Sequence, residues 1–255
     1  MVQFSSMESL ESIADLAAKF QAENPSVIVA LGGDGTLAGK WRELEGKSGK
    51  RKLLLPVRNY GMCPEHEELY RKLLRGDDGA PDLKMHLMPV VEARREAACG
   101  AMASDRALAE VTLVSADPTQ AIRFNVKIDG HLAAESVIAN GVIVATKLGS
   151  TGYFKSVART IFTEGLGIGY ICPTYSVPNI VTGMASKVEI ELLRKAPVTL
   201  TADKIKHDIK AWEGFKLEVS SASESVPVLG YSHFMCPECR RGRNSTIVND
   251  SYFVV

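Results

Sequence analysis

Residues 27–36, Val-Ile-Val-Ala-Leu-Gly-Gly-Asp-Gly-Thr, decide the fold of the first third of the chain. The five leading apolar residues are typical of a short parallel strand that is buried on both faces. The glycines from Gly32 onward then interrupt the strand, and residues 36–44 have helical character. A buried strand that passes through a glycine turn into a helix indicates an α/β layer structure.

The segments on either side continue this alternation of helix and strand. Apolar residues recur at three- and four-residue spacing over residues 7–20, which predicts an amphipathic helix. Residues 53–57 form a second apolar run, and Pro64 with the glutamates after it suits the first turn of a helix that extends to about Leu74. The order helix, strand, helix, strand, helix predicts a small parallel sheet.

Beyond residues 76–79 the pattern changes to strict alternation of apolar and polar residues. This alternation appears in residues 122–128, 188–192 and 215–219, and such strands are half-buried and usually antiparallel. We therefore expect an α/β N-terminal domain over residues 1–88 and a mostly β C-terminal domain over residues 89–255.

The composition excludes several classes of protein. The chain has 255 residues, 45% of them hydrophobic and 24% charged, which is typical of a globular protein. Its 30 basic and 30 acidic residues give a formal net charge of zero, which argues against nucleic acid as a partner. The start of the chain does not resemble a secretory signal, and no apolar run reaches the roughly 18 residues that cross a bilayer. We therefore expect a cytoplasmic protein that has no membrane partner.

Gly32-Gly33-Asp34-Gly35-Thr36 combines features of a phosphate-binding loop with a carboxylate. Open α/β sheets bind ligands at the carboxyl ends of their strands, and glycines there allow backbone N–H groups to approach a phosphate. Phosphates repel a carboxylate unless a metal intervenes or a hydroxyl proton has to be accepted, so Asp34 points to catalysis. The alternative is an ordinary turn in which Asp34 caps the helix.

A second buried strand, residues 140–146, leads into the small residues Gly149-Ser150-Thr151-Gly152 and then Tyr153. Such a turn can offer N–H and hydroxyl groups to a ligand while the tyrosine ring stacks on a base. Taken alone, an ordinary turn with a packed tyrosine is the better explanation.

His233-x-x-Cys236-x-x-Cys239 has the spacing of half a metal site. We identify no second pair of potential ligands close together in the sequence that would bring the number of metal ligands to four. The sequence therefore favours a solvated loop and assigns no metal-binding residues, but it leaves open whether Cys236 and Cys239 bind a metal.

The glycine-aspartate loop and the later turn, in this order and at this separation, resemble the NAD kinase family. Residues 149–153 are similar to the family's Gly-Ser-Thr-Ala-Tyr segment. Ala109-Glu110 occupies the place of its Asn-Glu strand, and Asn140-Gly141 lies where members often have Asp-Gly. The likeness extends from about residue 25 to residue 220.

This resemblance implies an NAD kinase-like two-domain fold and a phosphotransferase. The γ-phosphoryl of ATP, or of polyphosphate, would pass to the 2′-hydroxyl of the adenosine ribose of NAD to give NADP, with Mg²⁺ spanning the donor phosphates. Asp34 would be the catalytic residue, and the phosphate-binding residues would be Gly32, Gly33, Gly35 and Thr36. The implied NAD-binding residues are Glu110, Asn140, Ser150, Thr151, Gly152, Tyr153 and Ser156. The resemblance also implies a homo-oligomer.

Three departures from the family pattern all lie on the acceptor side. Ala109 replaces an asparagine that contacts the adenosine, Asn140 replaces an acid, and Lys147-Leu148 replaces Pro-Thr. Phosphoryl transfer is therefore better supported than the identity of the acceptor. Two alternatives remain: a lipid kinase of the diacylglycerol or sphingosine type, and a nucleotide-binding protein without catalytic activity.

Overall fold

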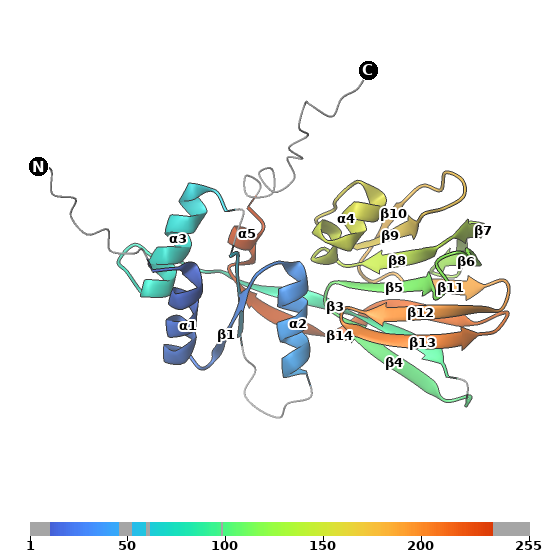
Figure 1. Cartoon of the computed structure of the whole chain (residues 1–255), viewed down its shortest axis with the longest axis horizontal. Helices are drawn as coiled ribbons and strands as arrows, with labels where there is room; N and C mark the ends of the chain where they lie inside the picture. Colours follow the sequence, from blue (N-terminus) through green and yellow to red (C-terminus); the bar gives the residue numbers. More distant parts are fainter. Residues whose placement is uncertain (1–10, 46–52, 60–61, 98, 237–255) are drawn as a thin grey trace, which may run out of the picture. The chain divides into compact units, whose positions relative to one another are not determined.

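The chain forms two units (Figure 1). The computed structural model describes residues 11–45, 53–59, 62–97 and 99–236. The first unit comprises residues 1–40, 46–86 and 227–255, and the second comprises residues 41–45 and 87–226.

The first unit contains the small parallel sheet and the helices that the sequence predicts. Strand β1 (Val27–Leu31) pairs in parallel with β2 (Leu53–Val57), and the last part of β14 (Lys216–Leu229) pairs in parallel with β2 through Val228 and Leu54. The helices of this unit are α1 (Ile13–Glu23), α2 (Asp34–Leu44) up to residue 40, α3 (Pro64–Arg75) and the short α5 (Tyr231–Phe234).

Local chemistry explains where α1 and α3 begin and end. The Ser12 hydroxyl accepts a hydrogen bond from the N–H of Asp15 at 3.1 Å in a capping box, so α1 begins at Ile13. Residues 7–10 of the predicted helix lie outside the described residues. Helix α3 begins at Pro64 as predicted and ends at Gly76, whose φ of 72° is the left-handed conformation that favours glycine. Apolar side chains of both helices and both strands share one core.

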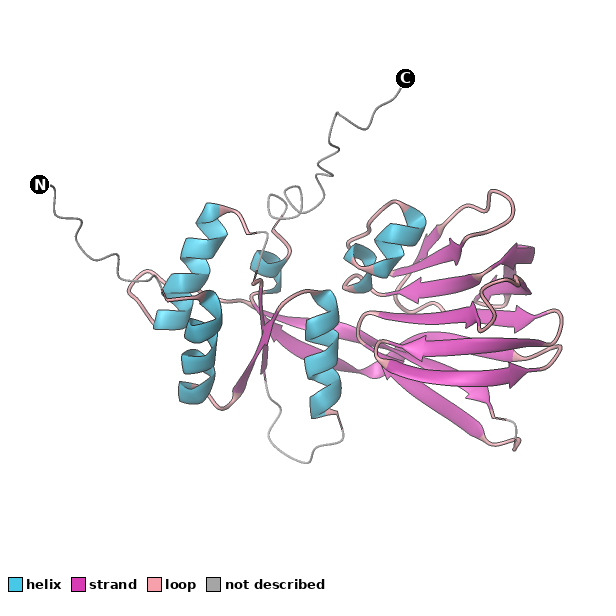
Figure 2. Cartoon of the chain, in the orientation of Figure 1, coloured by secondary structure: helices cyan, strands magenta, loops and turns pink. Residues whose placement is uncertain are grey.

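The second unit consists of two sheets, drawn in magenta in Figure 2. One sheet has the order β10 (Ile180–Thr182), β9 (Leu166–Ile171), β8 (Gly141–Ala145), β5 (Glu110–Ser115), β12 (Ala196–Ala202) and β13 (Ile205–Ala211). In the other sheet the strands are β14, β11 (Val188–Leu192), β6 (Ile122–Ile128) and β7 (His131–Ala139), with β3 (Met85–Glu96) beside β14 and β4 (Met102–Ala107) beside β3.

As the alternating sequence pattern predicts, antiparallel pairing joins β10, β9, β8, β5, β12 and β13 in one sheet, and it joins β14, β11, β6 and β7, as well as β3 and β4, in the other. Apolar side chains from both sheets, such as Leu113 of β5 and Phe124 of β6, belong to one buried cluster. Two helical segments, η1 (Gly149–Thr151) and α4 (Tyr153–Ala158), follow β8. The predicted α/β N-terminal part and β-rich C-terminal part are both present.

The unit boundaries differ from the expected division at residue 88 in two respects. One crossing lies between His86 and Leu87, close to that position, but residues 41–45 belong to the second unit and residues 227–236 belong to the first. Residues 227–236 return to the first unit because β14 runs past Val226, so that Val228 can pair with Leu54. A pairing between residues so far apart in the chain leaves no local signal in the sequence.

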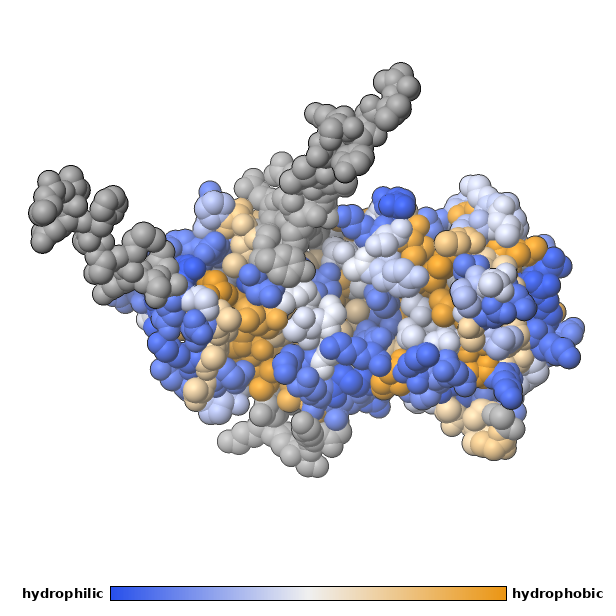
Figure 3. All heavy atoms as spheres, in the orientation of Figure 1, coloured by the Kyte–Doolittle hydropathy of each residue, from blue (hydrophilic) through white to orange (hydrophobic). Residues whose placement is uncertain are grey.

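On the face drawn in Figure 3, hydrophilic side chains predominate and hydrophobic ones form separate smaller areas. This distribution agrees with the large number of apolar side chains that are buried in the cores of the two units. Among the described residues, the helices are too short or too polar for any of them to span a bilayer.

Candidate functional site

The glycine-aspartate loop joins β1 to α2. The N–H of Gly32 donates to the carbonyl of Val57 at 2.8 Å, and the carbonyl of Gly33 accepts hydrogen bonds from the N–H groups of Thr36 and Leu37 at 3.0 and 3.1 Å. Gly32 has a φ of 149°, and a Cβ there would lie 2.4 Å from the Thr36 hydroxyl oxygen, so the turn requires glycine. The loop thus lies at the carboxyl end of β1 and opens α2, as predicted.

Gly35 is constrained differently, although it belongs to the same loop. A Cβ at Gly35 would meet no atom of the described chain within 4 Å, whereas a Cβ at Gly33 would lie 3.4 Å from Arg58 Nη1. Packing of the described residues therefore does not require glycine at position 35. What a glycine provides there is open backbone at the first turn of a helix, where N–H groups can reach an anion.

Asp34, the first residue of α2, forms an ion pair with Arg58. Arg58 Nη2 donates to Asp34 Oδ1 at 3.0 Å, and the two side chains are only 10% and 13% exposed. Arg58 directly follows β2, and neighbouring parallel strands end at the same edge of a sheet, so the two residues meet there. Sequence analysis did not identify Arg58. The available signal was its position at the end of the second apolar run.

The guanidinium of Arg58 also lies over an aromatic ring. Its central carbon is 3.7 Å from the ring centroid of Phe234, which is fully buried in α5. A guanidinium stacked on an aromatic face loses much of its rotational freedom. The orientation of the Asp34 carboxylate thus depends on Arg58, and that of Arg58 depends on α5.

In the second unit, the predicted turn at residues 149–153 lies against residues 108–110. The Thr146 hydroxyl donates to the carbonyl of Leu108 at 2.7 Å. A Cβ at Gly149 would lie 2.3 Å from the carbonyl oxygen of Ala109 and 2.8 Å from Glu110 Oε2. Glycine at position 149 therefore permits a close approach that places the Glu110 carboxylate beside the turn.

Asp203 holds the backbone of this same segment. Its carboxylate accepts hydrogen bonds from the N–H groups of Leu108, Ala109 and Glu110 at 2.7, 2.9 and 3.1 Å. Burial raises the pKa of Asp203, although the three N–H donors oppose this shift. The sequence analysis placed Asp203 only in a later family strand and did not assign this anchoring role.

Most of the residues expected to bind NAD lie around this turn. Tyr153 begins α4 with its ring 43% exposed, and burial, Cys172 and Glu110 together raise its pKa, so the phenol is neutral near pH 7. Thr151 and Gly152 lie beside it, and Ser156 is exposed one helical turn further on. Ser150 is different, because its side chain is fully buried and its hydroxyl oxygen lies 2.9 and 2.8 Å from the carbonyls of Lys147 and Phe162.

Asn140 does not lie beside this turn in the same chain, and its role in NAD binding stays a prediction from the resemblance. It precedes β8, whereas the turn follows β8, and the strand register pairs Glu110 with Ala145 at the far end. At roughly 3.3 Å per residue, the two ends of this segment are about 20 Å apart. The backbone of Asn140 instead donates to Ile171 at 2.8 Å.

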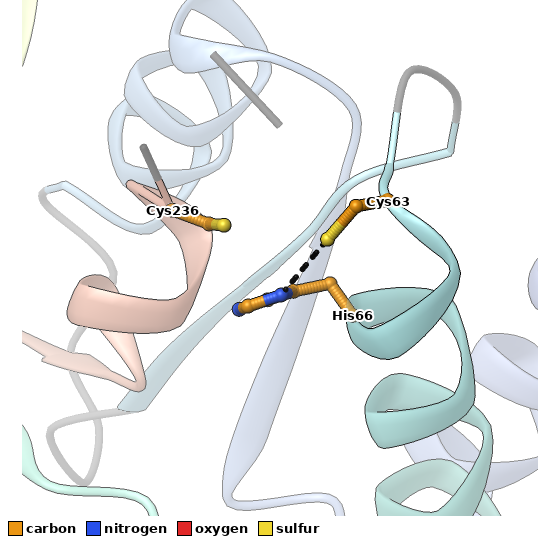
Figure 4. A group of neighbouring side chains, drawn as sticks. All are labelled: Cys63, His66 and Cys236. Carbon is orange, nitrogen blue, oxygen red and sulfur yellow. Dashed lines mark hydrogen bonds between the residues drawn. The ribbon is translucent and has the colours of Figure 1, made fainter. Parts of the chain in front are cut away.

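A third group of side chains in the first unit includes Cys236, one of the residues with metal-ligand spacing in the sequence. The ligand atoms of Cys63, His66 and Cys236 all lie within 4.8 Å of one another (Figure 4). Cys236 therefore has a second pair of potential ligands nearby, which the sequence analysis did not identify. Cys239 lies outside the described residues.

Comparisons with known proteins identify a family and relatives that this chain resembles. Residues 108–230 match the family model of the ATP-NAD kinase C-terminal domain. The chain is 32% identical to the NAD kinase of Pyrococcus abyssi over 199 residues, which cover 73% of this chain and 66% of that protein. It is 27% identical to the bifunctional NADP phosphatase/NAD kinase of Methanococcus maripaludis, over 68% of this chain and 31% of that protein. The chain thus spans two thirds or less of the length of these curated relatives.

Solved structures show the same fold. The yeast NADH kinase complexed with NADH superposes with a TM-score of 0.65 at 19% identity, over 90% of this chain and 68% of that one. An NAD kinase from Archaeoglobus fulgidus in complex with ATP superposes with a TM-score of 0.61 at 20% identity, over 88% of this chain and 86% of that one. Sequence and fold agree, and the chain belongs to the NAD kinase family.

Proposed function

We propose that this protein transfers the γ-phosphoryl group of ATP to the 2′-hydroxyl of the adenosine ribose of NAD, giving NADP. The observation that carries the proposal is the Asp34 carboxylate, which opens α2 in the glycine loop and is held by Arg58 at 3.0 Å. Membership of the NAD kinase family supports the choice of substrates. Phosphoryl transfer depends mainly on positioning and charge stabilisation, so one fixed carboxylate and a short glycine loop suffice.

Within the loop, the proposed roles follow from the local geometry. Asp34 accepts or orients the proton of the attacking hydroxyl through a carboxylate oxygen. Gly33 and Gly35 provide backbone N–H groups for the phosphates of ATP, and Thr36 provides its hydroxyl, because the N–H groups of Gly32 and Thr36 donate to the carbonyls of Val57 and Gly33. Gly32 contributes by forming the turn. Arg58 is a positioning residue, since it acts through Asp34.

Mg²⁺ fits this donor set as a partner of ATP. In phosphoryl-transfer sites Mg²⁺ is usually held by one or two carboxylates together with the substrate phosphates. Asp34 supplies one carboxylate at the loop, so the phosphates of ATP would supply most of the remaining ligands. When bound, the ion neutralises charge that develops on the transferred group.

The acceptor side of the proposal rests on Glu110, Tyr153 and their neighbours. The Glu110 carboxylate beside Gly149 can accept hydrogen bonds from ribose hydroxyls, and the exposed ring of Tyr153 can stack on a base. Thr151, Gly152 and Ser156 complete this group. Ser150 contributes by holding the turn, and Asn140, at the other end of β8, stays a predicted NAD-binding residue.

The decisive experiment measures NADP formation from NAD, ATP and Mg²⁺ in a coupled assay. Asp34→Asn can still accept a hydrogen bond from Arg58, but the amide cannot take a proton, so we expect the rate to fall about 10²- to 10⁴-fold with the fold retained. Asp78→Asn, at an exposed position of the same unit, should leave the rate unchanged. Full activity of the Asp34 variant would contradict the proposal.

The same assay distinguishes the alternatives when the acceptor is varied. Transfer to diacylglycerol but not to NAD would indicate a lipid kinase, and NAD binding without transfer would indicate a non-catalytic protein. NADH and polyphosphate, tested in parallel, would determine the preferred acceptor and donor. A cytoplasmic location remains a prediction from the sequence, and a homo-oligomeric state remains a prediction from the family resemblance.

A further inference from the structure

We infer that Cys63, His66 and Cys236 form a zinc-binding site in the first unit, separate from the proposed catalytic loop. The ligand atoms of these three residues lie within 4.8 Å of one another, and Cys63 Sγ is 3.3 Å from His66 Nδ1. Zinc bound tetrahedrally at about 2.3 Å from sulfur and 2.0–2.1 Å from nitrogen would separate two such ligand atoms by roughly 3.6 Å. The ligand atoms would therefore have to move by between a few tenths of an ångström and about 1 Å to bind the ion.

The two segments that bear these ligands share a short sequence. Residues 62–65 and residues 235–238 both read Met-Cys-Pro-Glu, and they are followed by His66 and Cys239. Cys-x-x-His and Cys-x-x-Cys are ligand spacings of structural zinc sites, in which each short turn presents two ligands. This repeat is the sequence signal for a second pair of ligands, and it lies far from Cys236 along the chain.

The local backbone explains how the first pair is presented. Cys63 is the N-cap residue of α3, with φ −73° and ψ 156°, and its thiol makes no capping hydrogen bond. Pro64 fixes the first helical position, and His66 follows within the same turn, so both side chains extend from one end of the helix toward Cys236 (Figure 4).

Burial and charge also suit a metal rather than a solvated cluster. Cys236 is 6% exposed, and Cys63 and His66 are partly buried. Two thiolates and one neutral imidazole would balance the charge of Zn²⁺, and soft thiolate ligands select zinc over Mg²⁺. The proposed site is therefore chemically distinct from one that would accept the Mg²⁺ of ATP.

The described residues supply three ligands, and the sequence offers two candidates for a fourth. Cys239 has the correct spacing from Cys236, and the ring of His233 lies 5.9 Å from that of His66. We propose zinc binding by the three described residues, and separate variants of Cys239 and His233 test which of the two is the fourth ligand.

Such a site would anchor the end of the chain where it returns to the first unit. Helix α5 has four residues, too few to be stable alone, and it ends two residues before Cys236. Phe234 of α5 lies under Arg58, which in turn holds Asp34. Zinc would thus fix the element that supports the Arg58–Asp34 pair, although zinc binding itself does not depend on the proposed function.

The test is the zinc content of the purified full chain, measured by mass spectrometry of the metal. We expect about one zinc ion per chain in the wild type, and a near-complete loss in Cys63→Ser, His66→Ala and Cys236→Ser. Cys99→Ser, an exposed position outside the cluster, is the matched control and should retain the metal. In the wild type reconstituted with Co²⁺, we expect thiolate-to-cobalt charge-transfer absorption, a measurement that remains valid if a variant fails to fold.

Several outcomes would overturn the inference. These are a wild type that takes up no zinc on reconstitution, zinc that all three variants retain, or a Cys63–Cys236 disulfide in place of the metal. Loss of zinc in Cys239→Ser or in His233→Ala would identify the fourth ligand, and retention in both would leave a three-residue site completed by water; each result supports the site. Zinc content is read without any assay of activity, so failure of this inference and failure of the kinase proposal are distinguishable.

Discussion

Gly32 and Gly35 show how one loop can carry both a folding requirement and a functional one. Gly32 has a φ of 149° and almost touches the Thr36 side chain, whereas Gly35 has open space where a Cβ would lie. The first glycine is needed for the turn itself. For the second, packing of the described residues does not require glycine, and we propose that a phosphate approaches the backbone there at the N-terminus of α2.

Alanine substitutions should separate these two roles. Gly32→Ala should lower the free energy of unfolding by about 1–3 kcal/mol, because alanine is strained at this φ. Gly35→Ala should leave stability unchanged or raise it by about 0.5–1 kcal/mol, since alanine favours a helix. The second variant should nevertheless lose ATP-dependent activity. Urea unfolding and the coupled assay measure the two effects, and full activity of Gly35→Ala would contradict the assigned role.

At the scale of elements, a buried ion-pair network connects three strands of the second unit. Arg95 of β3 donates to Asp105 of β4 at 2.5 Å, and the ring of His207 on β13 lies 3.0 Å from the same carboxylate. Burial alone would raise the pKa of Asp105, but the hydrogen bonds from Arg95 and His207 outweigh it and hold the pKa below its ordinary value. The carboxylate is therefore the form that the folded state prefers.

This shift predicts how stability depends on pH. Because the folded-state pKa of Asp105 is lowered, its stabilising contribution is fully present above the unfolded-state pKa of about 3.9 and is lost as pH falls through the folded-state pKa. Asp105→Asn should thus be less stable than the wild type at pH 7, and the difference should shrink as pH falls below 4. Urea unfolding at a series of pH values measures it. A difference that stays constant, or grows in acid, would show that the assigned pKa shift is wrong.

At the scale of the whole molecule, described residues from both the early and the late part of the chain belong to the first unit. Strand β14 leaves the second unit after Val226, pairs with β2 through Val228, and leads into α5, where Phe234 supports Arg58. The candidate catalytic loop near the start of the chain thus depends on residues near its end.

Truncation tests the dependence directly. A chain that ends at Val226 should lose hydrogen-exchange protection in residues 27–36 and 53–58, while the strands of the second unit keep theirs, because each unit has its own core. A chain that ends at Cys239 retains every described residue and should resemble the full chain. Unchanged protection in residues 27–36 after the shorter truncation would show that the returning segment is dispensable.

The sequence alone was sufficient to predict those structural features that depend on residues close together along the chain. The apolar run at residues 27–31, the glycine loop after it and the alternation at residues 122–128 predicted the strands, the turn and the two kinds of sheet. Hydrophobic period and turn chemistry are local properties, so they can be read from a window of a few residues. For the same reason the position of Asp34 at a strand end was predicted correctly.

Contacts between distant residues could be found only in three dimensions. Arg58 meets Asp34, Asp203 holds residues 108–110, and Cys236 approaches Cys63 across 173 positions of sequence. Asn140, by contrast, is close to the 149–153 turn in sequence yet separated from it by the length of β8. Strand pairing and register determine which side chains meet, and these depend on packing over the whole domain rather than on the residues nearby.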